Sequence, residues 1–168
     1  MTAPDSSPDA DVSSPVQYDT AAFERALRQL LGGENEPTRT RILFHGGTRE
    51  DRQRALATLT RHATANVHQF RAPSLLSERR MQTQNSLRKA FDHAAEESAL
   101  LYFDAADVLF AHSHVDTPDA PAESALPTTA EYFFDRVVAY DGVVVLALQK
   151  TSHVDRAEER VHLIVQFE

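Results

Sequence analysis

The chain has 168 residues, and 25 acidic residues against 17 lysines and arginines give it a net charge of −8. This length suits a single domain with its own core, and the charge argues against nucleic acid or an anionic membrane as the main partner. No cysteine is present, which excludes disulfides and thiolate chemistry. No stretch approaches the roughly 18 apolar residues of a membrane span, and residues 1–15 lack the pattern of a signal peptide. We therefore expect a cytoplasmic protein.

The first forty residues are predicted to precede the main domain. Residues 1–16 are mostly Ser, Pro, Asp and Ala and have little to bury, so we expect a disordered N-terminal tail. Residues 17–40 are predicted to form a helix and a linker, and Gly32-Gly33 ends the helix. The helix is predicted from apolar residues at three- and four-residue spacing: Phe23, Leu27, Leu30 and Leu31.

Residues 41–168 alternate apolar runs with amphipathic stretches, which predicts an α/β core with a parallel sheet. Five strands are expected from the apolar runs at 41–45, 67–70, 99–104, 143–148 and 163–167. Helices are expected after the first strand up to His62, before the third up to Glu97, and over 128–140, with one further turn at 155–159. Residues 72–81 are predicted to be an irregular connection, and the polar, proline-containing residues 111–127 a mobile loop.

Two features are predicted at the carboxyl edge of this sheet, where open α/β sheets bind ligands. Asp104 directly follows the apolar run 100–103, so a buried strand delivers a carboxylate. Gly46-Gly47 follows another strand and precedes a helix, which is the geometry of a phosphate loop. Both also have a structural interpretation, with the glycines making a turn and Asp104 accepting an internal hydrogen bond.

Three segments together resemble a known family. Residues 103–110, FDAADVLF, match the motif FFDEADALF, and residues 86–94, SLRKAFDHA, match NLRRLFDAA. Residues 132–136 and 140–147 match YLLQRMEEYDGLVILATN. From residue 41 onward, the chain resembles the large α/β subdomain of an AAA+ ATPase, most closely the ATPases found with phage-tail-like contractile injection systems. The resemblance implies a three-layer α-β-α, P-loop NTPase-like core with a five-stranded parallel sheet. No helical lid domain is expected.

The nucleotide-binding motif of this family is changed at several positions. A P-loop requires glycine, four residues, and then Gly-Lys-Ser or Gly-Lys-Thr; counting from Gly46 places Asp51, Arg52 and Gln53 at those last positions. Asp51 repels phosphate, Arg52 is a planar fork rather than an ammonium, and Gln53 lacks the hydroxyl that holds magnesium. The resemblance therefore implies that Gly46, Gly47, Arg52 and Gln53 are vestigial cofactor-binding residues.

The other motif positions follow the same trend. Asp104 corresponds to the acid that binds magnesium in the family and is predicted to be a vestigial metal ligand. Ala105 replaces the glutamate that acts as the general base in the family. Loss of such a base lowers the rate of hydrolysis by roughly 10²–10⁴. Gln149 is sensor-like and Arg160 is arginine-finger-like. Residues 78–81, at the pore-loop position, contain no aromatic side chain.

The resemblance, together with the changed nucleotide-binding and catalytic residues, implies a function. We expect a catalytically inactive AAA+-like domain, a pseudo-ATPase, that acts as an interaction, assembly or regulatory module and needs no cofactor. The expected partner is a protein, either an intact AAA+ ATPase or a component of a phage-tail-like assembly, and neither nucleic acid nor a membrane. The alternative is a divergent AAA+ ATPase that binds ATP and magnesium, with or without turnover, for example within a hetero-oligomer.

Two further groups of residues are given no site. His112 and His114 have a spacing that suits a metal, but no third ligand is adjacent in the sequence, and the other six histidines are scattered. A run of basic residues is interpreted as a solvated face or a partner contact rather than a nucleic-acid site, because no aromatic residues are interleaved with it. These basic residues are Arg71, Arg79, Arg80, Arg88 and Lys89.

Overall fold

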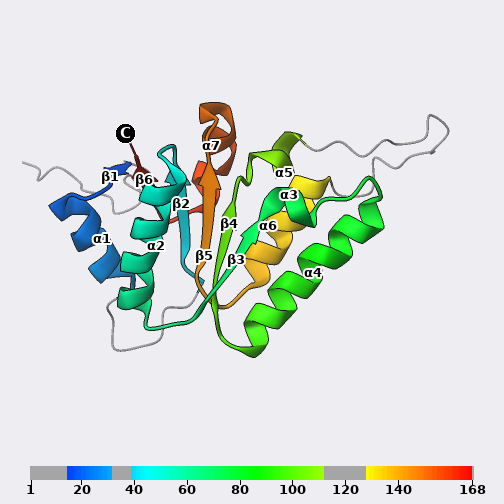
Figure 1. The fold of residues 1–168 in the computed structure, drawn as a ribbon, viewed down its shortest axis with the longest axis horizontal. Helices are drawn as coiled ribbons and strands as arrows, with labels where there is room; N and C mark the ends of the chain where they lie inside the picture. Colours follow the sequence, from blue (N-terminus) through cyan, green and yellow to red (C-terminus); the bar gives the residue numbers. More distant parts are fainter. Residues whose placement is uncertain (1–14, 32–38, 112–127, 168) are drawn as a thin grey trace, which may run out of the picture.

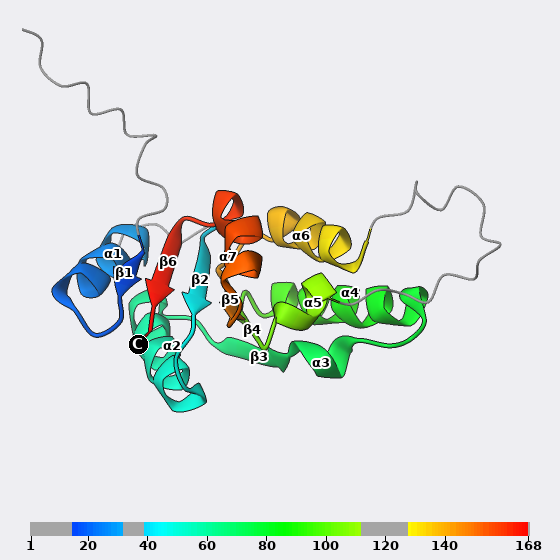
Figure 2. The same cartoon turned by 90° about the horizontal axis from the view of Figure 1, so that it is seen from above.

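A computed structural model describes residues 15–31, 39–111 and 128–167 of the chain. It contains a parallel sheet of six strands in the order β1-β6-β2-β5-β4-β3, which Figure 2 shows side by side. The strands are β1 (Val16–Gln17), β2 (Arg41–His45), β3 (Val67–Arg71), β4 (Leu100–Asp104), β5 (Val144–Leu148) and β6 (Leu163–Gln166). The α/β class and the parallel sheet are confirmed, and the predicted number of five strands is wrong because β1 adds a sixth.

The extra strand β1 lies at the edge of the sheet and pairs with β6. Its first residue, Val16, was predicted to belong to a disordered tail. Two residues are too few to show an alternating pattern, so no sequence signal marks them as a strand. The strand is held by a contact from the other end of the chain, since the next aromatic residue, Tyr18, stacks on Phe167 with ring centroids 4.9 Å apart.

The helices agree with the predicted ones in the long amphipathic stretches and differ in the short ones. The helices are α1 (Ala21–Leu31), α2 (Arg49–Ala63), α3 (Ala72–Leu75), α4 (Arg80–Glu96), α5 (Asp107–Ala111), α6 (Thr129–Ala139), α7 (Thr151–Ala157) and the 3₁₀ turn η3 (Glu158–Arg160). The prediction of an irregular 72–81 is wrong, since α3 and the start of α4 lie there. The turn expected at 155–159 belongs to a longer helical segment that begins at Thr151.

The sheet lies between two helical layers, with α1 and α2 on one side and α4 and α6 on the other (Figure 1). Alternate residues of β4 enter opposite cores, because successive side chains of a strand point to opposite faces. Leu100 and Tyr102 pack with α1 and α2, whereas Leu101 and Phe103 pack with α4 and α6. Asp104, two residues after Tyr102, therefore shares the face that is covered by α2.

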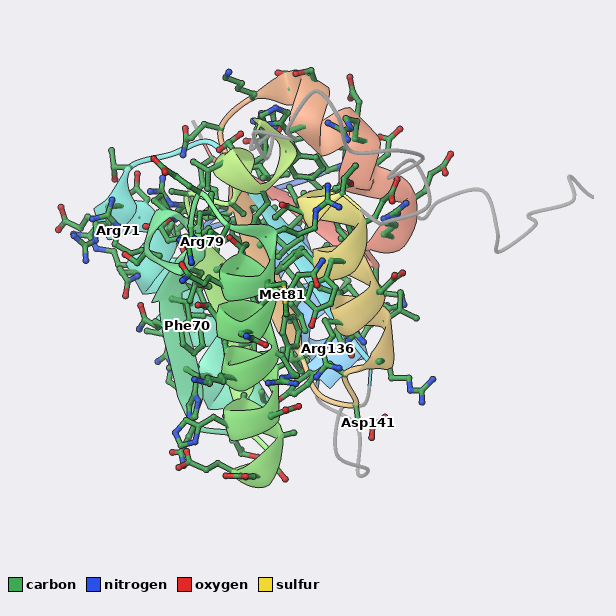
Figure 3. All side chains as sticks on the ribbon, turned by 90° about the vertical axis from the view of Figure 1, so that its right-hand side faces the viewer. Phe70, Arg71, Arg79, Met81, Arg136 and Asp141 are labelled. Atoms are coloured by element: carbon green, nitrogen blue, oxygen red, sulfur yellow. The ribbon has the colours of Figure 1, made fainter. Side chains whose placement is uncertain are left out.

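An aromatic cluster forms the core between the sheet and the α4–α6 layer. Phe103 is fully buried, and its ring centroid lies 5.6 Å from Phe70, 5.5 Å from Phe91 and 5.0 Å from Phe133. Figure 3 shows α4 facing the viewer between β3, which carries Phe70, and α6, which carries Arg136. The cluster joins β3, β4 and both helices into one packed unit.

Several predicted features lie outside the described residues. They are most of the N-terminal tail, the linker at 32–38, and the polar loop from residue 112 onward with His112 and His114. Among the described residues, no helix has both the length and the apolar character that crossing a membrane requires.

Candidate site at the carboxyl edge of the sheet

The carboxyl ends of β2, β5 and β4 meet at the upper edge of the sheet in Figure 1. Because β5 lies between the other two strands, its C-terminal end brings Gln149 next to the glycine turn after β2. Asp104 ends β4 on the other side of β5. The topology thus gathers the glycine turn, Asp104 and Gln149, which were predicted from the sequence as site residues, at one edge.

The glycine turn is packed against the last described residues of the chain. Gly46 and Gly47 have φ angles of +81° and +77°, in the left-handed region. A Cβ added to Gly47 would lie 2.5 Å from the Cβ of Phe167, so this position has no room for a side chain. The N–H of Gly46 donates to the carbonyl of Leu148 at 3.0 Å. Both glycines therefore have a structural reason to be present.

The helix that follows the turn, α2, provides its own N-terminal cap. The side-chain oxygen of Thr48 accepts a hydrogen bond from the N–H of Asp51 at 3.1 Å. Glu50 and Asp51 add two negative charges in the first turn, which offset the positive end of the helix dipole. A phosphate loop instead presents these N–H groups and this positive end to the ligand.

Arg52, at the position of the P-loop lysine, reaches back over the glycine turn. Its Nη1 donates to the carbonyl of Gly47 at 2.6 Å and to that of Gly46 at 3.4 Å. Its Nε lies 3.3 Å from Oδ1 of Asp104, and the two side chains are only 10% and 12% exposed. Nε makes no hydrogen bond, so this contact is an attraction between charges rather than an aligned hydrogen bond. The carbonyls of the turn and the strand-end acid thus converge on one cation of the same chain.

Tyr102 completes the surroundings of Asp104. Its hydroxyl donates to Oδ1 of Asp104 at 3.3 Å. Burial raises the pKa of Tyr102 and the charge of Asp104 raises it further, so the phenol stays protonated and remains a donor. Tyr102 was not predicted as a site residue. The two-residue spacing that puts both side chains on one face of β4 is the signal that would have identified it.

Asp107, three residues beyond Asp104, fixes the start of α7. Its Oδ2 accepts from the N–H of Gln149 at 2.8 Å, and its Oδ1 accepts from the N–H of Lys150 at 3.0 Å and lies 2.8 Å from Nδ1 of His153. Burial alone would raise the pKa of Asp107, but these hydrogen bonds outweigh it and hold the pKa below its usual range. The carboxylate is therefore engaged in joining α5 to the end of β5.

Replacing Asp107 by asparagine is expected to lower the free energy of unfolding by about 1–3 kcal/mol at neutral pH, because a charged acceptor of backbone N–H groups is lost. A carboxylate with a lowered folded-state pKa contributes stability that is present above its unfolded pKa of about 3.9 and is lost as pH falls through the folded pKa. The difference between the two proteins should therefore vanish in acid. Urea unfolding of both between neutral and strongly acidic pH measures it, and a difference that is constant with pH would contradict the role of the charge.

The remaining predicted residues are directed to separate partners. Gln149 Nε2 donates to the carbonyl of Gly46 at 3.5 Å, which brings it to the glycine turn. Gln53 Nε2 donates to Oε1 of Gln69 on β3 at 3.0 Å. The guanidinium carbon of Arg160 lies 4.5 Å from the ring centroid of Phe134. Of Gln149, Gln53 and Arg160, only Gln149 contacts the glycine turn.

A magnesium ion at Asp104 would lie beside the guanidinium of Arg52. Two unit charges of the same sign about 4 Å apart repel by roughly 1–4 kcal/mol, depending on the local dielectric, and the double charge of magnesium doubles this repulsion. Such an ion would therefore have to displace Arg52 from the carboxylate. As it stands, the edge holds a closed set of contacts that neutralises Asp104.

No protein-family model matches this chain, and none of the curated proteins with which it was compared matches it. At the described residues of the edge, Asp104 and Asp107 both have partners within the chain, and position 105 is an alanine with a φ of +52°.

Proposed function

We propose that this protein is a catalytically inactive AAA+-like module, a pseudo-ATPase, that acts as an interaction, assembly or regulatory subunit for other proteins. The main support is Arg52, which donates to the carbonyls of the glycine turn and pairs with Asp104. In an ATPase of the family that the chain resembles, the turn would face phosphates and the acid would face magnesium. Here the chain supplies a cation of its own to both.

The P-loop NTPase-like part of this proposal is supported by placement. The glycine turn follows the central strand β2 and leads directly into α2. Asp104 ends β4, with only β5 between β4 and β2. This arrangement puts a turn before a helix and a strand-end acid at one sheet edge, as a nucleotide site of this class requires.

The loss of hydrolysis is supported by the side chains that the edge lacks. Ala105 follows Asp104, so no carboxylate stands where the family places the glutamate that polarises water. Asp107 does not replace it, because both of its oxygens accept hydrogen bonds from the turn before α7. The proposed partner is a protein, an intact AAA+ ATPase or a component of a phage-tail-like assembly, in the cytoplasm. The net charge of −8 favours a protein partner over nucleic acid.

The purified protein is expected to give no heat of binding with ATP and magnesium up to millimolar nucleotide, and no release of phosphate. Isothermal titration calorimetry and a phosphate-release assay measure the two. A matched variant, Asp51→Gly/Arg52→Lys/Gln53→Thr, restores the P-loop residues, and nucleotide binding by that variant alone would support the proposal. ATP turnover by the unaltered protein that Asp104→Ala abolishes would refute it. Binding without turnover would instead indicate a nucleotide-binding scaffold.

A further inference from the structure

A second cluster of titratable side chains lies at the opposite edge of the sheet. His68 is near the amino end of β3, whereas His93 and Glu97 are at the C-terminal end of α4. One potential ligand atom from each of these three residues lies within 4.8 Å of the others. Figure 3 shows this flank of the molecule, with α4 beside β3 and its residue Phe70.

Within the cluster, His68 lies next to both Glu97 and His93. Nε2 of His68 lies 2.6 Å from Oε2 of Glu97, and the ring centroids of His68 and His93 are 5.0 Å apart. His93 and Glu97 are four residues apart at the end of α4, so they project from the same side of the helix. Two ligands at the end of α4 and a third on β3 thus form a three-sided site.

The strand ligand is held in place by its neighbours. Phe70 lies on the same face of β3, and its ring centroid is 6.5 Å from that of His68. Phe70 in turn stacks on Phe103, the centre of the aromatic cluster. The side chain of His68 is 15% exposed, whereas that of His93 is 64% exposed. One ligand is thus fixed by the core and another is free to adjust.

The local charge favours a cation. Glu97 brings a carboxylate into the cluster, and Oε2 of Glu96 lies 3.8 Å from Nδ1 of His93. The last carbonyls of α4 add the negative end of the helix dipole. Two imidazoles and a carboxylate suit zinc and similar transition metals, whereas magnesium and calcium prefer oxygen ligands alone.

We propose that His68, His93 and Glu97 bind a zinc ion that ties the edge strand β3 to the end of α4. Tetrahedral zinc places its ligand atoms about 3.3 Å apart, so His93 must turn inward and the contact between His68 and Glu97 must open slightly. Three protein ligands leave a fourth position for water. This inference is independent of the proposed function, because no residue of the carboxyl edge takes part.

The test is a zinc titration of the full chain after removal of metal with EDTA. Isothermal titration calorimetry with zinc chloride is expected to show binding of one equivalent, and the melting temperature should rise with zinc concentration. His68→Ala and His93→Ala should each weaken zinc affinity by at least about 10-fold. Loss of a residue that only hydrogen-bonds to a metal ligand already weakens metal binding by about that factor, and loss of a ligand itself should weaken it at least as much. Glu97→Gln, at a half-exposed side chain, should weaken zinc affinity while leaving the fold intact. Magnesium chloride should produce neither effect.

Two control variants distinguish this site from other histidines. His62→Ala removes a histidine that also pairs with a glutamate, Glu24, at 3.2 Å but lies outside the cluster. His112→Ala/His114→Ala removes the pair whose spacing suits a metal. Both controls should keep the affinity of the unaltered chain, with folding of every variant checked by circular dichroism. No zinc binding up to millimolar metal, or equal binding by a His68→Ala/His93→Ala variant, would overturn the proposal.

Discussion

Replacing Arg52 by methionine is expected to lower the free energy of unfolding by about 3–5 kcal/mol, because it leaves Asp104 as a buried charge without its cation. The side chains of both residues are nearly nine-tenths buried, so solvent screens the pair only weakly. The change also removes the hydrogen bonds to the carbonyls of Gly46 and Gly47. The remaining hydrogen bond, from Tyr102, is neutral and compensates only in part.

Urea denaturation of four proteins measures this effect. Arg52→Met/Asp104→Leu should regain much of the lost stability, since replacing both members of a buried pair with apolar residues is often neutral or stabilising. Arg54→Met is the matched control on the same helix: Arg54 pairs with Glu50 at 2.8 Å, but the two side chains are 64% and 76% exposed. Its loss should stay below about 1 kcal/mol. Equal losses for Arg52→Met and Arg54→Met would show that the buried pair has no special role.

Phe103→Ala should lower the free energy of unfolding by about 3–5 kcal/mol, the usual cost of removing a fully buried aromatic ring. Phe103 is inaccessible to solvent, and its ring contacts Phe70, Phe91 and Phe133. The cavity would open between the sheet and the α4–α6 layer, where side chains of four elements meet. Collapse of the surrounding core is limited because β4, which carries Phe103, is held between β3 and β5.

Unfolding in urea and the near-ultraviolet circular dichroism signal of the aromatic rings test this expectation. Phe103→Leu keeps most of the volume and should cost less than half as much. Met81→Ala, at an α4 side chain that is 75% exposed, should change stability by less than about 0.5 kcal/mol. A Phe103→Ala protein as stable as the Met81→Ala protein would refute the role of the cluster.

The interior strands could be predicted from the sequence because both of their faces are buried. Every residue of β4 and β5 is buried. A strand that is buried on both faces has a nearly continuous run of apolar residues, and such a run can be recognised in the sequence. The short elements could not be predicted for the opposite reason. β1 depends on Tyr18 stacking on Phe167, and α7 begins where it does because Asp107 accepts hydrogen bonds from the preceding turn. These contacts join distant parts of the chain, so no local pattern records them.

The candidate site shows the same division. The ends of the predicted strands and the spacing from Gly46 predict that Asp104, Arg52 and the glycine turn lie at one edge of the sheet. In the structure, Arg52 contacts both the glycine turn and Asp104. The direction of Arg52 could not be predicted, because it depends on carbonyl orientations set by the two left-handed glycines. The cluster with His68 at the other edge was also missed. The i, i+4 spacing of His93 and Glu97 was readable, but their strand partner depends on how α4 packs.

The position of β2 also has a consequence for how the chain assembles. Leu43 of β2 pairs with Leu146 on one side and with Ile164 on the other, so both neighbours of this strand are synthesised long after it. During synthesis, β3, α4 and β4 can form a local unit early. Until β5 and β6 have been synthesised, β2 has no neighbouring strand to pair with and its apolar residues stay exposed. Contacts of such large sequence separation slow folding, and an unpaired apolar strand is prone to aggregation. The nascent chain should therefore depend on chaperones until β6 has emerged.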